Sequence, residues 1–63
     1  MNDKDSVIAA YADLVKSLTS VFLEAQMTAK DDAARTLADK NFKKGLATAR
    51  AARDRALGLI GTA

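Results

Sequence analysis

The chain contains no proline and sets its apolar residues at helical spacing over most of its length. Proline is the residue that breaks a helix most strongly, and alanine, which is very frequent here, loses the least side-chain entropy in one. In the first half, alternating steps of three and four residues connect Ile8, Tyr11, Val15, Leu18, Phe22, Ala25 and Ala29. Such a stripe is typical of a helix packed against another element. It predicts a helix over about residues 4–28.

A second, weaker stripe follows in the second half, along Ala34, Ala38, Phe42, Leu46, Ala49, Ala52 or Arg53, Ala56 and Ile60. It predicts a helix over about residues 31–60. The turn between the helices falls near Thr28, which resembles a capping box with Asp31. The fold class is therefore all-α: one domain over residues 1–63, built as an antiparallel helical hairpin. A break near residues 39–41 would give three segments instead of two, and the sequence leaves both arrangements open.

The charges divide between the two halves. Residues 1–32 hold three basic and six acidic side chains, a net charge of −3, whereas residues 33–63 hold seven basic and two acidic side chains, a net charge of +5. An acidic helix beside a basic helix is an attractive pairing, within one chain or between chains.

A chain of 63 residues has little room for a core of its own. Such a core rarely contributes more than about 3–5 kcal/mol, so small proteins add disulfides, a metal or a partner. Cysteine and histidine are both absent, which excludes disulfides and the commonest metal ligands. We therefore expect self-association into a helical bundle, as a homodimer or higher oligomer. The residues expected in the core or oligomer interface are Val7, Ile8, Tyr11, Leu14, Val15, Leu18, Val21, Phe22, Phe42, Leu46, Ala49, Ala56 and Ile60.

No constellation of catalytic residues can be traced. The serines have no histidine partner, and Asp13 and Glu24 stand about 16 Å apart along a helix, too far for a paired acid and base. We expect no enzymatic activity, no cofactor and no metal site.

Five basic residues fall on one broad arc of the second predicted helix, which we call the basic arc: Lys40, Lys43, Lys44, Arg50 and Arg55. Such an arc is a candidate contact for nucleic-acid phosphates or an acidic partner. No aromatic residue is interleaved for stacking on bases, so a solvated charged face is favoured over nucleic-acid binding.

Arg53 lies at the edge of the second apolar stripe, between Ala49 and Ala56. Its stem can cover apolar surface while the guanidinium reaches water, which is the favoured interpretation. The sharper alternative is an ion pair with Asp13 or Glu24 that fixes the register of a dimer.

The most apolar stretch, residues 7–23, is interrupted by Asp13 and Lys16. We judge it too polar and too short for a membrane span. The N-terminus also lacks a basic segment followed by an apolar run, so we expect no signal peptide and a cytoplasmic location.

The sequence thus favours a small interaction protein, an adaptor, inhibitor or assembly subunit, that acts through its helix surfaces and by self-association. We also expect it to bind a protein partner whose identity the sequence does not give. Two alternatives stay open: a nucleic-acid-binding regulator that uses the basic arc, and a helical structural subunit that polymerises through its acidic and basic halves.

Overall fold

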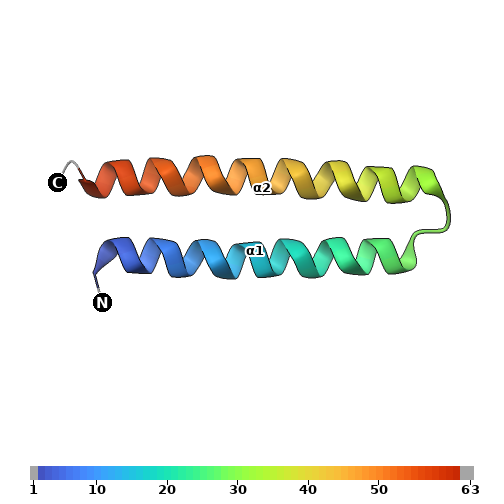
Figure 1. Cartoon of the computed structure of the whole chain (residues 1–63), viewed down its shortest axis with the longest axis horizontal. Helices are drawn as coiled ribbons and strands as arrows, with labels where there is room; N and C mark the ends of the chain where they lie inside the picture. The colour runs from blue at the N-terminus through green and yellow to red at the C-terminus, as the bar shows by residue number, and fades with distance from the viewer. Residues whose placement is uncertain (1, 62–63) are drawn as a thin grey trace.

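Two long antiparallel helices make up the fold (Figure 1). The computed structural model describes residues 2–61, with helix α1 at Asp3–Thr28 and helix α2 at Asp32–Gly61. Residues 29–31 reverse the chain, so the start of α1 and the end of α2 lie at the same end of the molecule (Figure 1). The prediction of an all-α helical hairpin is confirmed.

Helix α2 is continuous through residues 39–41, and the three-segment alternative is wrong. The polar residues there do not interrupt the helix. Asp39 instead accepts a hydrogen bond from Gln26 of α1, and Phe42 packs against α1, so this segment is held in helical register by contacts across the hairpin.

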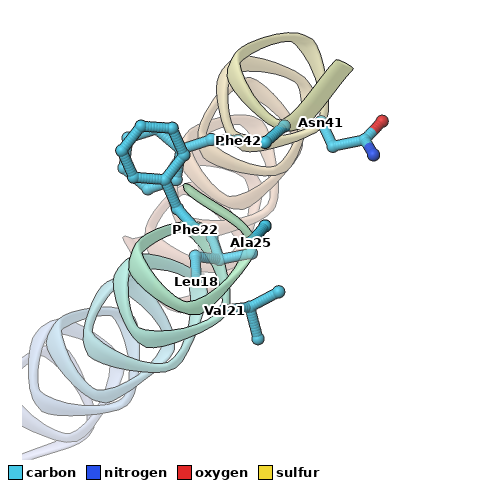
Figure 2. A pocket seen from close by; sticks show the side chains of 7 residues that line it. Leu18, Val21, Phe22, Ala25, Asn41 and Phe42 are labelled. Atoms are coloured by element: carbon cyan, nitrogen blue, oxygen red, sulfur yellow. The ribbon is translucent and has the colours of Figure 1, made fainter. Parts of the chain in front are cut away.

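The helices meet through small buried residues, half-buried aliphatic side chains and a stacked aromatic pair. The Phe22 and Phe42 rings stack with their centroids 4.6 Å apart and an angle of 27° between their planes (Figure 2). An aromatic pair of this kind contributes about 0.5–1.5 kcal/mol beyond the area it buries. Among the described residues only Ala38 and Ala49 are buried, at 8% and 5% exposure. The alanines of α2 thus let the helices approach closely, but they enclose very little apolar volume.

The start of α1 is capped by Asn2, whose Oδ1 accepts a hydrogen bond from the backbone N–H of Asp5 at 2.8 Å. Asp3 and Asp5 place carboxylates in the first turn, at the positive end of the helix dipole. These interactions explain why the helix begins where it does.

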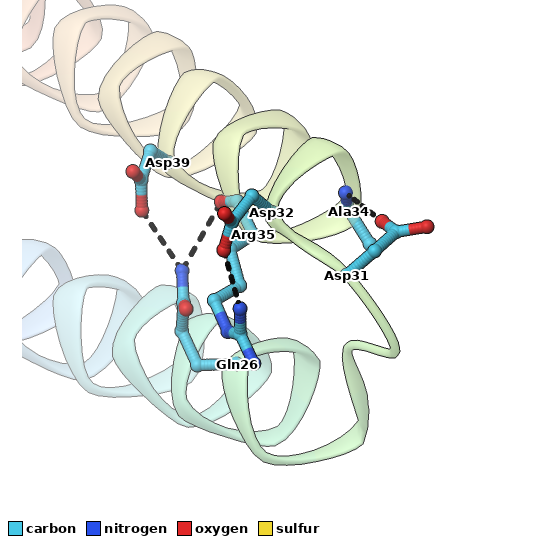
Figure 3. A network of polar contacts seen from close by, with 6 residues as sticks. All are labelled: Gln26, Asp31, Asp32, Ala34, Arg35 and Asp39. Carbon is cyan, nitrogen blue, oxygen red and sulfur yellow. Dashed lines mark hydrogen bonds and ion pairs between the residues drawn. The ribbon is translucent and has the colours of Figure 1, made fainter.

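The start of α2 is capped by Asp31, whose Oδ1 accepts a hydrogen bond from the N–H of Ala34 at 2.8 Å (Figure 3). Thr28 does not act as the cap that the sequence suggested. It is the last residue of α1, and its hydroxyl donates back to the carbonyl of Glu24 at 3.0 Å. A threonine hydroxyl in the last turn of a helix can donate to the carbonyl four residues earlier. Thr28 is used in this way, so Asp31 caps the next helix.

The hairpin is an open, single layer of two helices. Its Cα atoms extend over 49 × 18 × 6 Å, with a radius of gyration of 14.8 Å. A compact domain of this length has a radius of gyration of about 11 Å. Both broad faces of the layer are therefore open, and no third element covers either one in the described chain.

Candidate interaction surface

Large apolar side chains are widely exposed on the hairpin. Val21 is 67% exposed, and Met27 is 86% exposed. Among residues 2–61 the exposed large apolar side chains are Ile8, Leu14, Val21, Leu23, Met27, Leu37 and Leu59. Single exposed apolar residues are normal on protein surfaces, but a chain this small with so many of them exposes an extended apolar surface.

The residues predicted for the core or oligomer interface divide into three groups. Ala49 is buried, whereas Ile8, Leu14 and Val21 are exposed. The remainder are half-buried between the helices: Val7, Tyr11, Val15, Leu18, Phe22, Phe42, Leu46, Ala56 and Ile60. The hairpin thus brings most of the predicted residues to one seam and leaves three large ones beside it.

An open apolar groove of about 200 Å³ lies on one side of this seam. Val21 and Asn41 project along its two edges, on the side away from the stacked Phe22 and Phe42 rings (Figure 2). The groove exists because the rings fill the other side of the seam, while Ala25 and other small residues line this one.

The groove belongs to a longer row of uncharged residues on each helix. Residues seven apart on a helix differ by only about 20° in direction. Val7, Leu14 and Val21 therefore form a row along α1, and Ala34, Asn41 and Thr48 form a row along α2 that Arg55 continues seven residues further. Since Val21 and Asn41 line the same groove, both rows border the same side of the hairpin. We call this side the uncharged face, defined by those six residues.

The opposite side of the hairpin carries a set of polar contacts near the turn, along with the exposed Ile8 and Leu23. There the Gln26 side-chain amide donates to Asp39 Oδ1 at 2.8 Å and to the carbonyl of Arg35 at 3.2 Å (Figure 3). Arg35 in turn pairs with Asp32 at 2.6 Å through Nη1. We call the two hydrogen bonds donated by Gln26 the Gln26 clamp. The sequence alone did not predict it. A signal was present, because Gln26 follows Phe22 by four residues and so lies at the edge of the apolar stripe.

Arg53 lies across the helix interface with its guanidinium over the Tyr11 ring, 4.6 Å from Cζ to the ring centroid. Its carboxylate partner is the neighbouring Asp54, with Nε and Nη2 each 3.0 Å from Oδ1. The side chain is 31% exposed. Within one chain the Arg53 guanidinium therefore stacks on the Tyr11 ring, which neither sequence interpretation included, and its ion pair is with Asp54 and not with Asp13 or Glu24. A register-fixing role in a dimer stays a prediction.

The basic arc is exposed on α2 at all five positions. None of its side chains pairs with a carboxylate of the described residues, because the two ion pairs there use Arg35 and Arg53. The acids of α1 thus do not neutralise the arc within one hairpin, and its charge remains available to a partner.

By length and composition, α1 is apolar enough to cross a membrane. Its most apolar stretch of 18 residues has a mean hydropathy of 1.4, and none of α1 is buried in the hairpin. The judgement that this segment is too polar and too short for a span is therefore wrong as a statement about composition, because Asp13 and Lys16 do not outweigh the apolar residues around them. Core helices of soluble proteins and signal sequences pass the same test, so no location follows from it.

Within residues 2–61, no group of three or more His, Cys, Asp or Glu side chains lies close enough together to hold a metal ion. The chain matches no family model, no curated protein and no solved structure. The basis for a functional proposal is therefore the surface of the hairpin itself.

Proposed function

We propose that this chain is a small helical interaction protein, an adaptor, inhibitor or assembly subunit, that acts through its helix surfaces and by self-association and has no catalytic activity of its own. The observation that carries the proposal is the exposure of Ile8, Leu14 and Val21 beside a seam whose buried residues are two alanines. An apolar surface of this extent is typical of a protein that works in contact with another surface.

The energetics support association. Burying one Val, Leu or Ile side chain contributes about 1.5–3 kcal/mol relative to leaving it in water. A hairpin that leaves such side chains in water lacks much of the folding free energy that their burial would contribute. A small chain without a disulfide or a metal has few other contributions to its stability. Covering Leu14 and Val21 by a partner recovers that contribution.

Thermal unfolding followed by circular dichroism at several chain concentrations tests the proposal. Since a partner that binds only the folded hairpin stabilises it by mass action, Tm should rise as the concentration goes from micromolar to near-millimolar. A Tm that is independent of concentration, for a protein that remains monomeric, would contradict self-association.

A second candidate function is the binding of nucleic acid or another polyanion by the basic arc. It is favoured by one observation: the five side chains are exposed and have no carboxylate partner among the described residues. The net charge of only +2 and the lack of an aromatic residue beside the arc rank it second. Open-ended polymerisation through the acidic and basic halves ranks third.

A further inference from the structure

We propose that the uncharged face binds the uncharged face of a second copy, with both turns at the same end, so that α1 of each chain lies beside α2 of its partner in a four-helix bundle. This inference rests on the self-association proposed above. It names the surface that associates and the arrangement of the two copies.

The exposed area supports a second copy as the occupant. The chain exposes 4961 Å², whereas a folded monomer of its mass, 6.7 kDa, exposes about 3,900 Å². The excess is about 1,000 Å² per chain, or about 2,000 Å² for two chains. A standard protein–protein interface buries about 1,200–2,000 Å² in total. Closure of one face of each hairpin on the other is thus an interface of the size that a stable dimer needs.

The uncharged face is the side best suited to this burial. The six residues of this face carry no charge, so closing them on each other desolvates no ion, and the row on α2 first reaches a charged residue at Arg55, toward the open end of the hairpin. The opposite side carries the Gln26 clamp and the charges of α2 around it. Burial of that side would remove ionised groups from water without partners.

The charge of the two halves selects the arrangement. Two hairpins can meet face to face with their turns at the same end or at opposite ends. With the turns at opposite ends, α1 would lie on α1 and α2 on α2. The halves with a net charge of −3 would then face each other, as would the halves with a net charge of +5. Turns at the same end place each half of −3 beside a half of +5, which is the electrostatically complementary arrangement.

The register within the hairpin makes this pairing specific. Phe22 faces Phe42 across the seam, so Glu24 lies level with the residues just before Phe42. With the turns at the same end, a two-fold axis parallel to the helices keeps every residue at its own height. Glu24 then lies within about one helical turn, or 6 Å, of the height of Lys44 of the partner subunit. Both residues lie toward the outer edges that this arrangement brings together.

The same register places a projecting side chain opposite each groove. Val21 is next to Phe22 and is therefore level with Phe42, which lines the groove. In the two-fold arrangement, Val21 of the partner subunit lies at the height of this groove. Its 67% exposed side chain supplies the apolar volume that the alanine-lined seam lacks.

The surface is tested with a matched pair of lysine variants and sedimentation equilibrium. Val21 and Leu23 are 67% and 54% exposed on the same helix, but their directions differ by about 160°. Val21→Lys should raise the dimer dissociation constant by about a hundredfold or more, since it buries an unpaired charge. Leu23→Lys should leave it within about threefold, since an exposed substitution changes little. Weakening by Leu23→Lys with no effect of Val21→Lys would overturn the proposed surface, although the proposed function would stand.

The arrangement is tested by the distance between two turns. The chain has no cysteine, so Lys30→Cys allows one spin label per chain at the turn. The proposed arrangement predicts an inter-label distance much shorter than the 49 Å length of the hairpin. A distance close to that length would overturn it. A wild-type chain that stays monomeric and binds phosphatidylcholine vesicles instead would contradict both the inference and the proposed self-association.

Discussion

Leu18 packs directly onto the backbone of Gly45 across the helix interface. A Cβ atom placed on Gly45 would lie 2.9 Å from Leu18 Cδ2 and 3.5 Å from Cδ1. The glycine therefore provides a hollow on α2 that the larger side chain of α1 fills. Glycine destabilises the helix by about 1 kcal/mol relative to alanine, and the close approach of the two helices at this point offsets that loss.

Gly45→Ala and Gly58→Ala make the same chemical change on the same helix, and only one meets a neighbour. No atom lies within 4 Å of a Cβ at Gly58. We expect Gly58→Ala to raise the free energy of unfolding by about 0.5–1 kcal/mol through helix propensity. Gly45→Ala should give a smaller gain or a net loss, because Leu18 must move to avoid overlap. Denaturant unfolding of both variants measures the difference.

The Leu18 contact can be isolated by a double-mutant cycle. In a Leu18→Ala background, Gly45→Ala should recover the gain seen at Gly58, because the clashing methyl groups are gone. If Gly45→Ala stabilises the wild-type and the Leu18→Ala chains equally, the close approach of the two residues has no energetic consequence, and the account of Gly45 is wrong.

Phe22→Ala should be far more damaging than Leu23→Ala, although the residues are neighbours. Phe22 stacks on Phe42, whereas Leu23 is 54% exposed on the side of the Gln26 clamp. We expect a loss of about 2 kcal/mol or more for Phe22→Ala and of less than about 0.5 kcal/mol for Leu23→Ala. Equal losses in denaturant melts would place Leu23 in an interface and contradict the face assigned to it.

Asp31→Ala should destabilise the start of α2 by about 1 kcal/mol, since it removes the acceptor for the N–H of Ala34. Asp31→Asn is the matched control. It removes the charge but keeps an Oδ1 acceptor, and asparagine caps helices about as well as aspartate. Chemical denaturation of both variants separates capping from charge: a similar loss in the two would show that the carboxylate charge at this helix end matters and the cap does not.

Binding of nucleic acid by the basic arc would show a steep dependence on salt, with a slope near −0.9 per phosphate contacted on a duplex. We expect weak binding at physiological ionic strength, because the net charge is only +2. Lys43→Gln combined with Lys44→Gln should then change little in a titration followed by fluorescence anisotropy. Tight, salt-sensitive binding that this double variant abolishes would promote the polyanion-binding function to first place.

The hairpin itself could be predicted because its signals are local. The stripe from Ile8 to Ala29 and the lack of proline are properties of neighbouring residues in sequence, and they suffice for two helices and a turn. The exposure of Leu14 and Val21 in a lone hairpin agrees with this pattern, since two facing stripes cannot surround each other.

Contacts between the helices could not be predicted in the same way. The Gln26 clamp on Asp39, the seat of Leu18 on Gly45 and the cap at Asp31 all depend on how far one helix is shifted along the other. That shift is set by the length of the turn and by packing across the seam. No fixed spacing of residues in the sequence indicates either of them.

The most direct test of the central claim, that the hairpin associates with a second copy, is sedimentation equilibrium of the unmodified chain over a range of concentrations. The account predicts a molar mass that rises from the 6.7 kDa of one chain and levels off at twice that value. A mass that stays at one chain up to near-millimolar concentration would contradict the account, and a mass that keeps rising without a plateau would replace the closed pair with open-ended assembly.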